Sequence, residues 1–250
     1  MRTFGSLLVR GLIVGLFAGL LAGTFAYVMG EPRVDAAIAI EEAGGHTHTD
    51  EQADHDHQDQ AGEQPLVSRD GQKAGLFVAT SLYGVALGGL FAVAFTFLRR
   101  KLRTENDAYA ALGLAAAGFV GIVLVPFFKY PPNPPAVGDP ETITKRTVTY
   151  LMTLVIGLLA VWAGVALSRW AERYGEIARL AGGVAGVVAT VVAAYLILPR
   201  INEVPETFPA TLLWQFRFAS LGTQATLWLL LGFGYAVAVD RRPARQKVAG

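Results

Sequence analysis

All four histidines of the chain lie in one short acidic segment. They form two pairs with one residue between the members, and carboxylates alternate with the second pair. Imidazole and carboxylate groups are common ligands of divalent transition metals such as Co²⁺, Ni²⁺ and Zn²⁺. This composition predicts loose capture of such a metal, and a solvated loop without a ligand is the alternative. The candidate ligands are His46, His48, Asp54, His55, Asp56 and His57.

No other part of the sequence carries a recognisable metal or catalytic motif. The chain has no cysteine and no His-Glu-x-x-His motif, so neither a thiolate site nor a zinc-peptidase site is expected. The phosphate-binding loop Gly-x-x-x-x-Gly-Lys-[Ser/Thr] is also absent. We therefore expect no enzyme activity and no permanently bound cofactor, with the metal as a transported ion. A net charge of +1 gives no electrostatic basis for nucleic-acid binding.

Six apolar runs, each about 20 residues long, match a bilayer whose hydrocarbon core is about 30 Å thick. The whole chain is 53% hydrophobic and only 16% charged. Because only helices satisfy their own backbone polar groups in hydrocarbon, the sequence predicts an all-α, polytopic transmembrane bundle. The predicted spans are Leu7–Met29, Leu76–Leu98, Tyr109–Phe128, Val148–Trp170, Ile177–Leu198 and Phe218–Val239.

The sequence divides into three parts. The first helix occupies residues 1–30, an outer segment residues 31–75, and a five-span bundle with two proline-rich outer loops residues 76–250. A proline near the start of residues 31–42 and acidic residues around it predict a short amphipathic helix on the outer membrane surface. Residues 41–68 are polar and acidic without apolar periodicity, which is typical of disorder.

A cleaved signal peptide is the alternative for the first span. Its apolar stretch, Gly11–Met29, is longer than the usual hydrophobic region of a signal peptide. The adjoining Gly30-Glu31-Pro32 is a poor small-residue cleavage site. We therefore expect the helix to be retained.

Lysine and arginine gather in alternate loops, which sets the expected orientation. These loops are predicted to face the cytoplasm of a bacterial inner membrane, together with both chain termini. The histidine segment and the loops at 129–146 and 200–217 are then extracytoplasmic. The basic residues on the predicted inner side are Arg2, Arg10, Arg99, Arg100, Lys101, Arg103, Arg169, Arg173, Arg179, Arg241, Arg242, Arg245 and Lys247.

Two spans carry small residues at every fourth position. Such stripes let helix backbones approach closely, so we expect them to pack within the bundle. Homo-oligomerisation or packing against a partner helix is the alternative. The stripes are Gly11, Gly15, Gly19 and Gly23 in the first span, and Ala178, Gly182, Gly186, Thr190 and Ala194 in the fifth.

Oxygen-bearing side chains in the three outer segments could form the entrance of a metal pathway. Carboxylates and amides offer hard ligands there, although pairing with arginine is the alternative for the acids. Inside the spans charge is almost absent, and Gln224 is the candidate for a site within the bundle, whereas Ser81 and Tyr83 are further polar groups. The candidate entrance residues are Glu31, Asp35, Asn133, Asp139, Asn202, Glu203 and Glu206.

The chain resembles the CbtA family, which comprises predicted cobalt-transporter membrane subunits of bacteria. The resemblance rests above all on the run Lys129-Tyr-Pro-Pro-Asn-Pro-Pro-Ala-Val-Gly138, and also on Glu31-Pro32 and Trp214-Gln-Phe-Arg217. The resemblance implies cobalt uptake linked to cobalamin synthesis. It also implies two kinds of partner, namely membrane lipid and often a small, one-span, histidine-bearing companion subunit. The family is usually described with five spans, whereas this sequence predicts six. Residue types alone leave nickel and zinc open, and also a scaffold that does not transport.

The absence of native cysteine makes the predicted orientation directly testable. A cysteine introduced as Gln52→Cys should react with a membrane-impermeant thiol reagent added outside intact cells, because residues 41–68 are expected outside. A cysteine introduced as Ala249→Cys should react only after the membrane is opened. Labelling of the first variant from the cytoplasmic side alone would invert the predicted topology.

Overall fold

The computed structural model describes residues 3–45, 68–101 and 104–240. All four histidines, Asp54 and Asp56 lie outside these ranges, so their proposed role in metal capture stays a prediction. Every regular element among the described residues is helical. The α-helices are α1 (Phe4–Phe25), α2 (Glu31–Gly45), α3 (Arg69–Leu98), α4 (Asp107–Gly118), α5 (Val125–Lys129), α6 (Ile143–Ala171), α7 (Glu176–Ile197) and α8 (Ala210–Val239).

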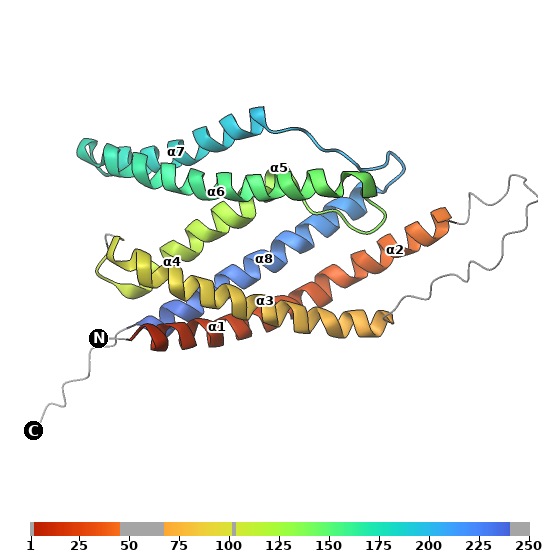
Figure 1. Ribbon diagram of the computed structural model, residues 1–250, viewed down its shortest axis with the longest axis horizontal. Helices are drawn as coiled ribbons and strands as arrows, with labels where there is room; N and C mark the ends of the chain where they lie inside the picture. The colour runs from red at the N-terminus through yellow and green to blue at the C-terminus, as the bar shows by residue number, and fades with distance from the viewer. Residues whose placement is uncertain (1–2, 46–67, 102–103, 241–250) are drawn as a thin grey trace, which may run out of the picture.

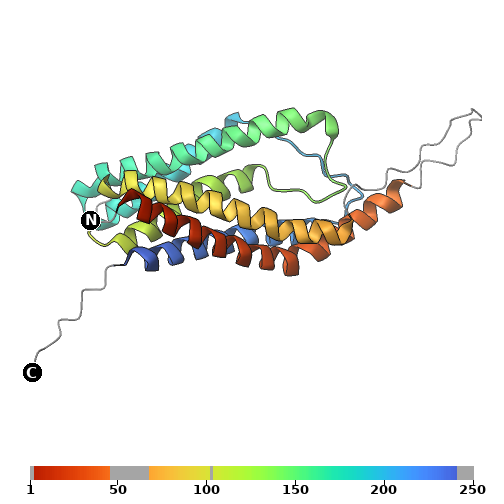
Figure 2. The ribbon, with the colours of Figure 1, turned by 60° about the horizontal axis from the view of Figure 1, so that its bottom comes forward.

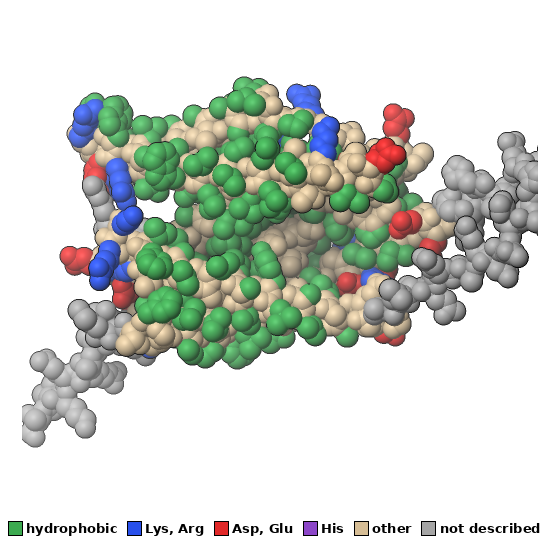
Figure 3. Space-filling view, in the orientation of Figure 1, with side chains coloured by type: hydrophobic (Ala, Val, Ile, Leu, Met, Phe, Trp, Pro, Cys, Tyr) green, Lys and Arg blue, Asp and Glu red, His purple; other side chains and the backbone are tan. Residues whose placement is uncertain are grey.

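Six helical stretches of the described chain are long and apolar enough to cross a membrane, which confirms the predicted fold class and number of spans. They run along one common axis (Figure 1). Apolar side chains cover the middle of the molecule, whereas lysine, arginine and carboxylates gather at its two ends (Figure 3). This distribution is the one that a protein spanning a bilayer requires.

The helices form two groups. In one, α1 packs between α3 and α8, and in the other α6 packs against α7. The third span joins the groups, because α4 packs against α8 while its outer continuation packs against α6. Both described chain ends lie at one end of the bundle, and α2 projects from the other (Figures 1 and 2). A hollow separates the two groups on the face shown in Figure 3.

Backbone contact through glycine holds α1 against α3. Gly11, Gly15 and Gly19 of α1 face Gly84 and Gly88 of α3 so closely that a methyl group added to any of them would overlap the opposite backbone. The second stripe behaves alike, because α7 meets α6 through its own small residues. Both stripes therefore pack within the bundle, as the sequence predicts.

Two prolines lie inside continuous helices rather than at their ends. Residues Ala26–Gly30 and Phe119–Leu124 are π-helical, and each segment ends two residues before a proline, Pro32 or Pro126. Proline lacks the N–H for a regular helical bond and its ring crowds the preceding turn, and a π-helical turn relieves this by inserting a residue. The sequence interpretation of 31–42 as a separate surface helix therefore differs from the structure, in which α2 continues α1 (Figure 1).

The second span also begins earlier than the sequence predicts. Helix α3 starts at Arg69 rather than near Leu76. The Ser68 hydroxyl accepts a hydrogen bond from the Gly71 amide at 3.2 Å, and Asp70 lies in the first turn. A serine cap and an acidic first turn both stabilise a helix N-terminus, which explains why the polar residues before the apolar run are helical.

A bulky side chain at the α1–α3 contact should separate the two backbones. Gly15→Leu should reduce folded protein in the membrane, because overpacking costs about 1–3 kcal/mol even where neighbours can move, and here the neighbour is backbone. Gly113→Leu is the matched control, since nothing lies within 4 Å of the position that its Cβ would take. Fluorescence-detected size-exclusion chromatography of detergent extracts measures both. Equal monodispersity and melting temperature of the two variants would contradict the packing described.

Candidate functional site

The three segments that the sequence predicts to be outer meet over an apolar cluster. Ala37 of α2, Val137 of the proline-rich loop, Phe208 of the last outer loop and Leu213 of α8 are buried together. Segments that are far apart in the sequence are thereby held at one end of the bundle. The polar residues predicted for an entrance are distributed around this cluster.

Two of the predicted entrance carboxylates pair with the start of α3. Arg69 donates to Glu31 through one guanidinium nitrogen and to Asp35 through another, the latter at 2.8 Å. Lys73 donates to Asp35 at 3.2 Å. The Glu31 side chain is only 13% exposed, so loss of Arg69 would leave a largely buried carboxyl group without a partner. These bonds fix the base of α2 to α3.

A second ion pair lies at the outer end of α6. Arg146 donates to Glu203 at 3.1 Å, and the Glu203 side chain is 9% exposed. The same carboxylate accepts hydrogen bonds from the Asp139 amide at 3.2 Å and from the Thr142 hydroxyl. The Asp139 carboxylate instead accepts from the Glu141 amide at 2.9 Å. Glu203 therefore joins the two outer loops.

The proline-rich loop is also bonded to α8. Arg217 donates to the Asn133 side-chain oxygen at 2.9 Å and its guanidinium lies over the Trp214 ring, 5.8 Å from the centroid. Of the remaining predicted entrance residues, Asn202 and Glu206 are exposed. The structure thus places Asn133 in a structural bond and these two at the surface.

Lys129 and Tyr130 fasten the same loop to the end of α7. The Lys129 ammonium donates to the Tyr195 and Leu198 carbonyls at 2.9 and 3.0 Å. These are unsatisfied carbonyls at a helix C-terminus, where a cation is favourable. The Tyr130 hydroxyl donates to the Pro199 carbonyl at 2.8 Å. Burial raises the pKa of the Tyr130 hydroxyl, so it stays protonated and able to donate.

The described residues at this end of the bundle form a network of ion pairs. Among the residues that the structure describes, no group of three or more histidine, aspartate or glutamate side chains is placed to hold a metal ion. Glu31, Asp35 and Glu203 already have cationic partners. A metal ion bound to Glu31 or Glu203 would have to replace Arg69 or Arg146 as the partner of the carboxylate.

The most unusual polar position inside the bundle is Gln224 on α8. Its side-chain oxygen is buried without a hydrogen-bond partner in the described structure, and so is the indole nitrogen of Trp228 one turn later. Gln224 interacts with the Tyr83 hydroxyl of α3, and Tyr150 of α6 lies near the same hydroxyl. The neighbouring Thr223 hydroxyl, by contrast, is satisfied by its own helix. An unpaired buried acceptor is costly, which favours a role in binding.

Both π-helical segments lie beside this part of α8. The Phe25 ring, at the start of the first, contacts Gly222, and the Trp228 ring contacts Gly118, just before the second. Gln224 lies between these two contacts along α8. Single π-helical turns inside α-helices occur frequently at functional sites. The sequence predicts Gln224 and Tyr83 separately, but the approach of Tyr150 is a tertiary contact without a sequence signal of its own.

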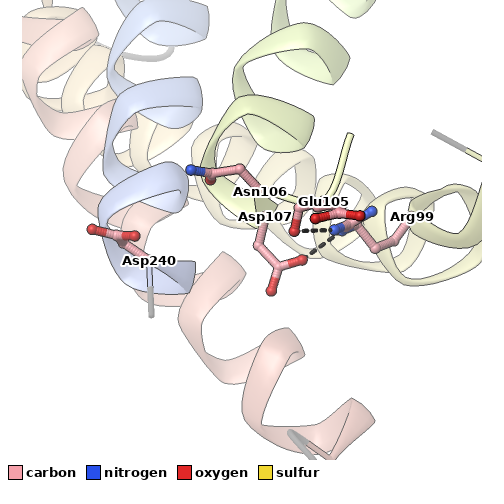
Figure 4. A pocket seen from close by; sticks show the side chains of 5 residues that line it. All are labelled: Arg99, Glu105, Asn106, Asp107 and Asp240. Carbon is pink, nitrogen blue, oxygen red and sulfur yellow. Dashed lines mark hydrogen bonds and ion pairs between the residues drawn. The ribbon is translucent and has the colours of Figure 1, made fainter. Parts of the chain in front are cut away.

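A polar pocket of about 370 Å³ opens at the opposite end of the bundle. Arg99, Glu105, Asn106, Asp107 and Asp240 line it (Figure 4). Arg99 donates to the Asp107 carboxylate and, at 3.0 Å, to the Glu105 carbonyl. The Asn106 side chain caps α4 by accepting from a backbone amide at 2.8 Å. These bonds show that the polar groups that they join in the pocket belong to the start of α4 and to its connection with α3.

Comparison with known proteins supports one assignment. The family model described as "Probable cobalt transporter subunit (CbtA)" matches residues 4–240. No curated protein and no solved structure matches the chain. The matched range includes all six spans and the three outer segments described above. The chain therefore belongs to the CbtA family of probable cobalt transporter subunits.

Proposed function

We propose that this protein is a multi-pass subunit of a bacterial inner membrane that takes up a divalent transition metal, with Co²⁺ as the first choice. The family match over nearly the whole chain carries this proposal. Both termini face the cytoplasm in the proposed orientation, which agrees with the gathering of basic residues at one end. A small companion subunit with its own histidines would complete the complex that the word subunit implies.

The proposed capture site is the histidine segment, with His46, His48, His55 and His57 as ligands beside Asp54 and Asp56. Imidazole and carboxylate suit Co²⁺, Ni²⁺ and Zn²⁺ alike. The segment comes after α2 and precedes α3, whose start contacts α2 through Arg69. Capture would therefore take place at the same end as the entrance candidates.

The proposed route continues past Gln224. The amide oxygen is a buried acceptor without a partner among the described residues. Gln224 also interacts with the Tyr83 hydroxyl, and Tyr150 lies near that hydroxyl. Neutral oxygen donors can bind an ion or the water around it without an additional buried charge, whose desolvation would be costly. Tyr83 and Tyr150 are 47% and 44% exposed, as expected for side chains beside a gap between helix groups.

Cells that express the chain should accumulate Co²⁺ in a mass-spectrometric uptake assay with Ni²⁺ and Zn²⁺ as competitors. Replacing all four histidines by glutamine should weaken uptake at limiting metal and spare it at high metal, because a capture site raises the local concentration without forming the route. Uptake at limiting metal should also fall below about pH 6, since histidine protonates near pH 6.5 and then cannot bind metal.

The assay separates the proposal from its alternatives. Unchanged uptake by the four-histidine variant at limiting metal would make the segment a solvated spacer. No accumulation with this chain alone, but accumulation with a companion subunit, would make the chain a scaffold. Stronger uptake of Ni²⁺ or Zn²⁺ than of Co²⁺ would reassign the metal.

Replacing the interior amide should impair uptake at every metal concentration. Gln224→Leu removes the unpaired oxygen at similar size, and a lost hydrogen bond or ligand of this kind corresponds to about a tenfold lower rate. Gln215→Leu, on the exposed outer part of the same helix, is the matched control and should retain uptake. Equal amounts of folded protein must be verified for both. Full uptake by a well-folded Gln224→Leu variant would remove this residue from the route.

A further inference from the structure

A groove opens between α4 and the α6–α7 pair. Its volume is about 440 Å³. Short side chains create the space, because Ala116 of α4, Gly164 of α6 and Gly183 of α7 all line it. Val120 and Val187 add apolar walls. No part of the route proposed above uses this groove.

The groove has a cationic mouth at the end of the bundle that carries both termini. Lys101, Arg169 and Arg179 line it there, opposed by the single carboxylate of Glu172. Arg169 donates to the Lys101 carbonyl at 3.0 Å, which holds the two residues together. The mouth therefore carries an excess of positive charge next to an apolar channel.

Arg179 provides a second, independent observation. One of its terminal guanidinium nitrogens bonds to the exposed Glu176 on the same helix. Its Nε, however, is buried and has no hydrogen-bond partner in the described structure. The Arg179 side chain as a whole is 40% exposed, but a buried N–H without an acceptor is unfavourable. The groove therefore lacks an acceptor at this point.

We propose that this groove is a binding site for one anionic phospholipid of the leaflet at that end. An acyl chain would fill the apolar channel, and the headgroup phosphate would accept from Arg179, Arg169 and Lys101. Basic pockets between transmembrane helices bind anionic headgroups in this way. A cationic mouth beside an apolar channel matches the anionic headgroup and the acyl chain of one phospholipid.

Native mass spectrometry of the purified, delipidated full-length chain tests the proposal. Phosphatidylglycerol should bind more tightly than phosphatidylcholine. Each basic residue near an anionic lipid contributes about fivefold in affinity, so the double variant Lys101→Gln/Arg179→Gln should lose roughly 25-fold in phosphatidylglycerol affinity. The control Arg173→Gln/Lys145→Gln removes the same charge, but neither residue lines the groove, and its affinity should be unchanged.

A second variant tests the apolar channel without altering charge. Ala116→Phe should fill the groove and weaken phosphatidylglycerol binding, whereas glycerol phosphate, which has the headgroup chemistry without acyl chains, should neither bind nor compete. Equal binding of the two phospholipids, equal loss in the control double variant, or unchanged binding in Ala116→Phe would overturn the proposal. Competition by glycerol phosphate would also overturn it, because the basic residues at the mouth would then form a site for a free anion and not for a lipid.

Discussion

Lipid tails are as apolar as leucine side chains, so helices within a bilayer gain little by burying apolar surface against one another. This constraint makes close backbone packing the main source of helix association, and α1 meets it through Gly11, Gly15 and Gly19. Once α1 lies against α3, its other side is available for α8. Arg10 then donates to the Ala238 carbonyl at 2.7 Å, which joins the two ends of the described chain. The position of Gln224 in α8 therefore depends on a glycine contact elsewhere.

Charge is handled differently at the two ends and in the middle. At the end of the bundle from which α2 projects, Glu31 and Glu203 are largely buried but paired with arginines. Removal of one partner from such a pair is more damaging than replacement of both. Glu31 and Glu203 therefore hold the loops in place, whether or not they also bind a metal ion. In the middle the unpaired groups are neutral, namely the Gln224 oxygen and the Trp228 nitrogen. The protein thus keeps its ionic bonds for structure and leaves neutral donors and acceptors available inside.

Much of this arrangement is readable from local sequence, and the remainder depends on tertiary contacts. Apolar length predicts the six spans, and the glycine stripe of α1 predicts a close contact, because both are local properties of one helix. The prediction of a helix with Pro32 at its start is confirmed in part, because α2 begins at Glu31 but a π-helical turn joins it to α1. Arg69 pairs with Glu31, and Tyr150 lies near Tyr83. Both contacts join residues that are far apart in the chain. The apolar periodicity of the sequence does not predict such contacts.

The continuation of α1 into α2 determines the electrostatic environment at the far end of α2. Helix α2 has 15 residues and projects from the end of the bundle (Figure 2), so Gly45 lies roughly 21 Å from Glu31 at 1.5 Å per residue. The Debye length at physiological ionic strength is about 8 Å. Salt would therefore screen almost completely the potential of a lipid surface level with Glu31. Cations near the tip of α2 respond to the protein's own charges, and their local concentration should be the same over membranes of different anionic lipid content.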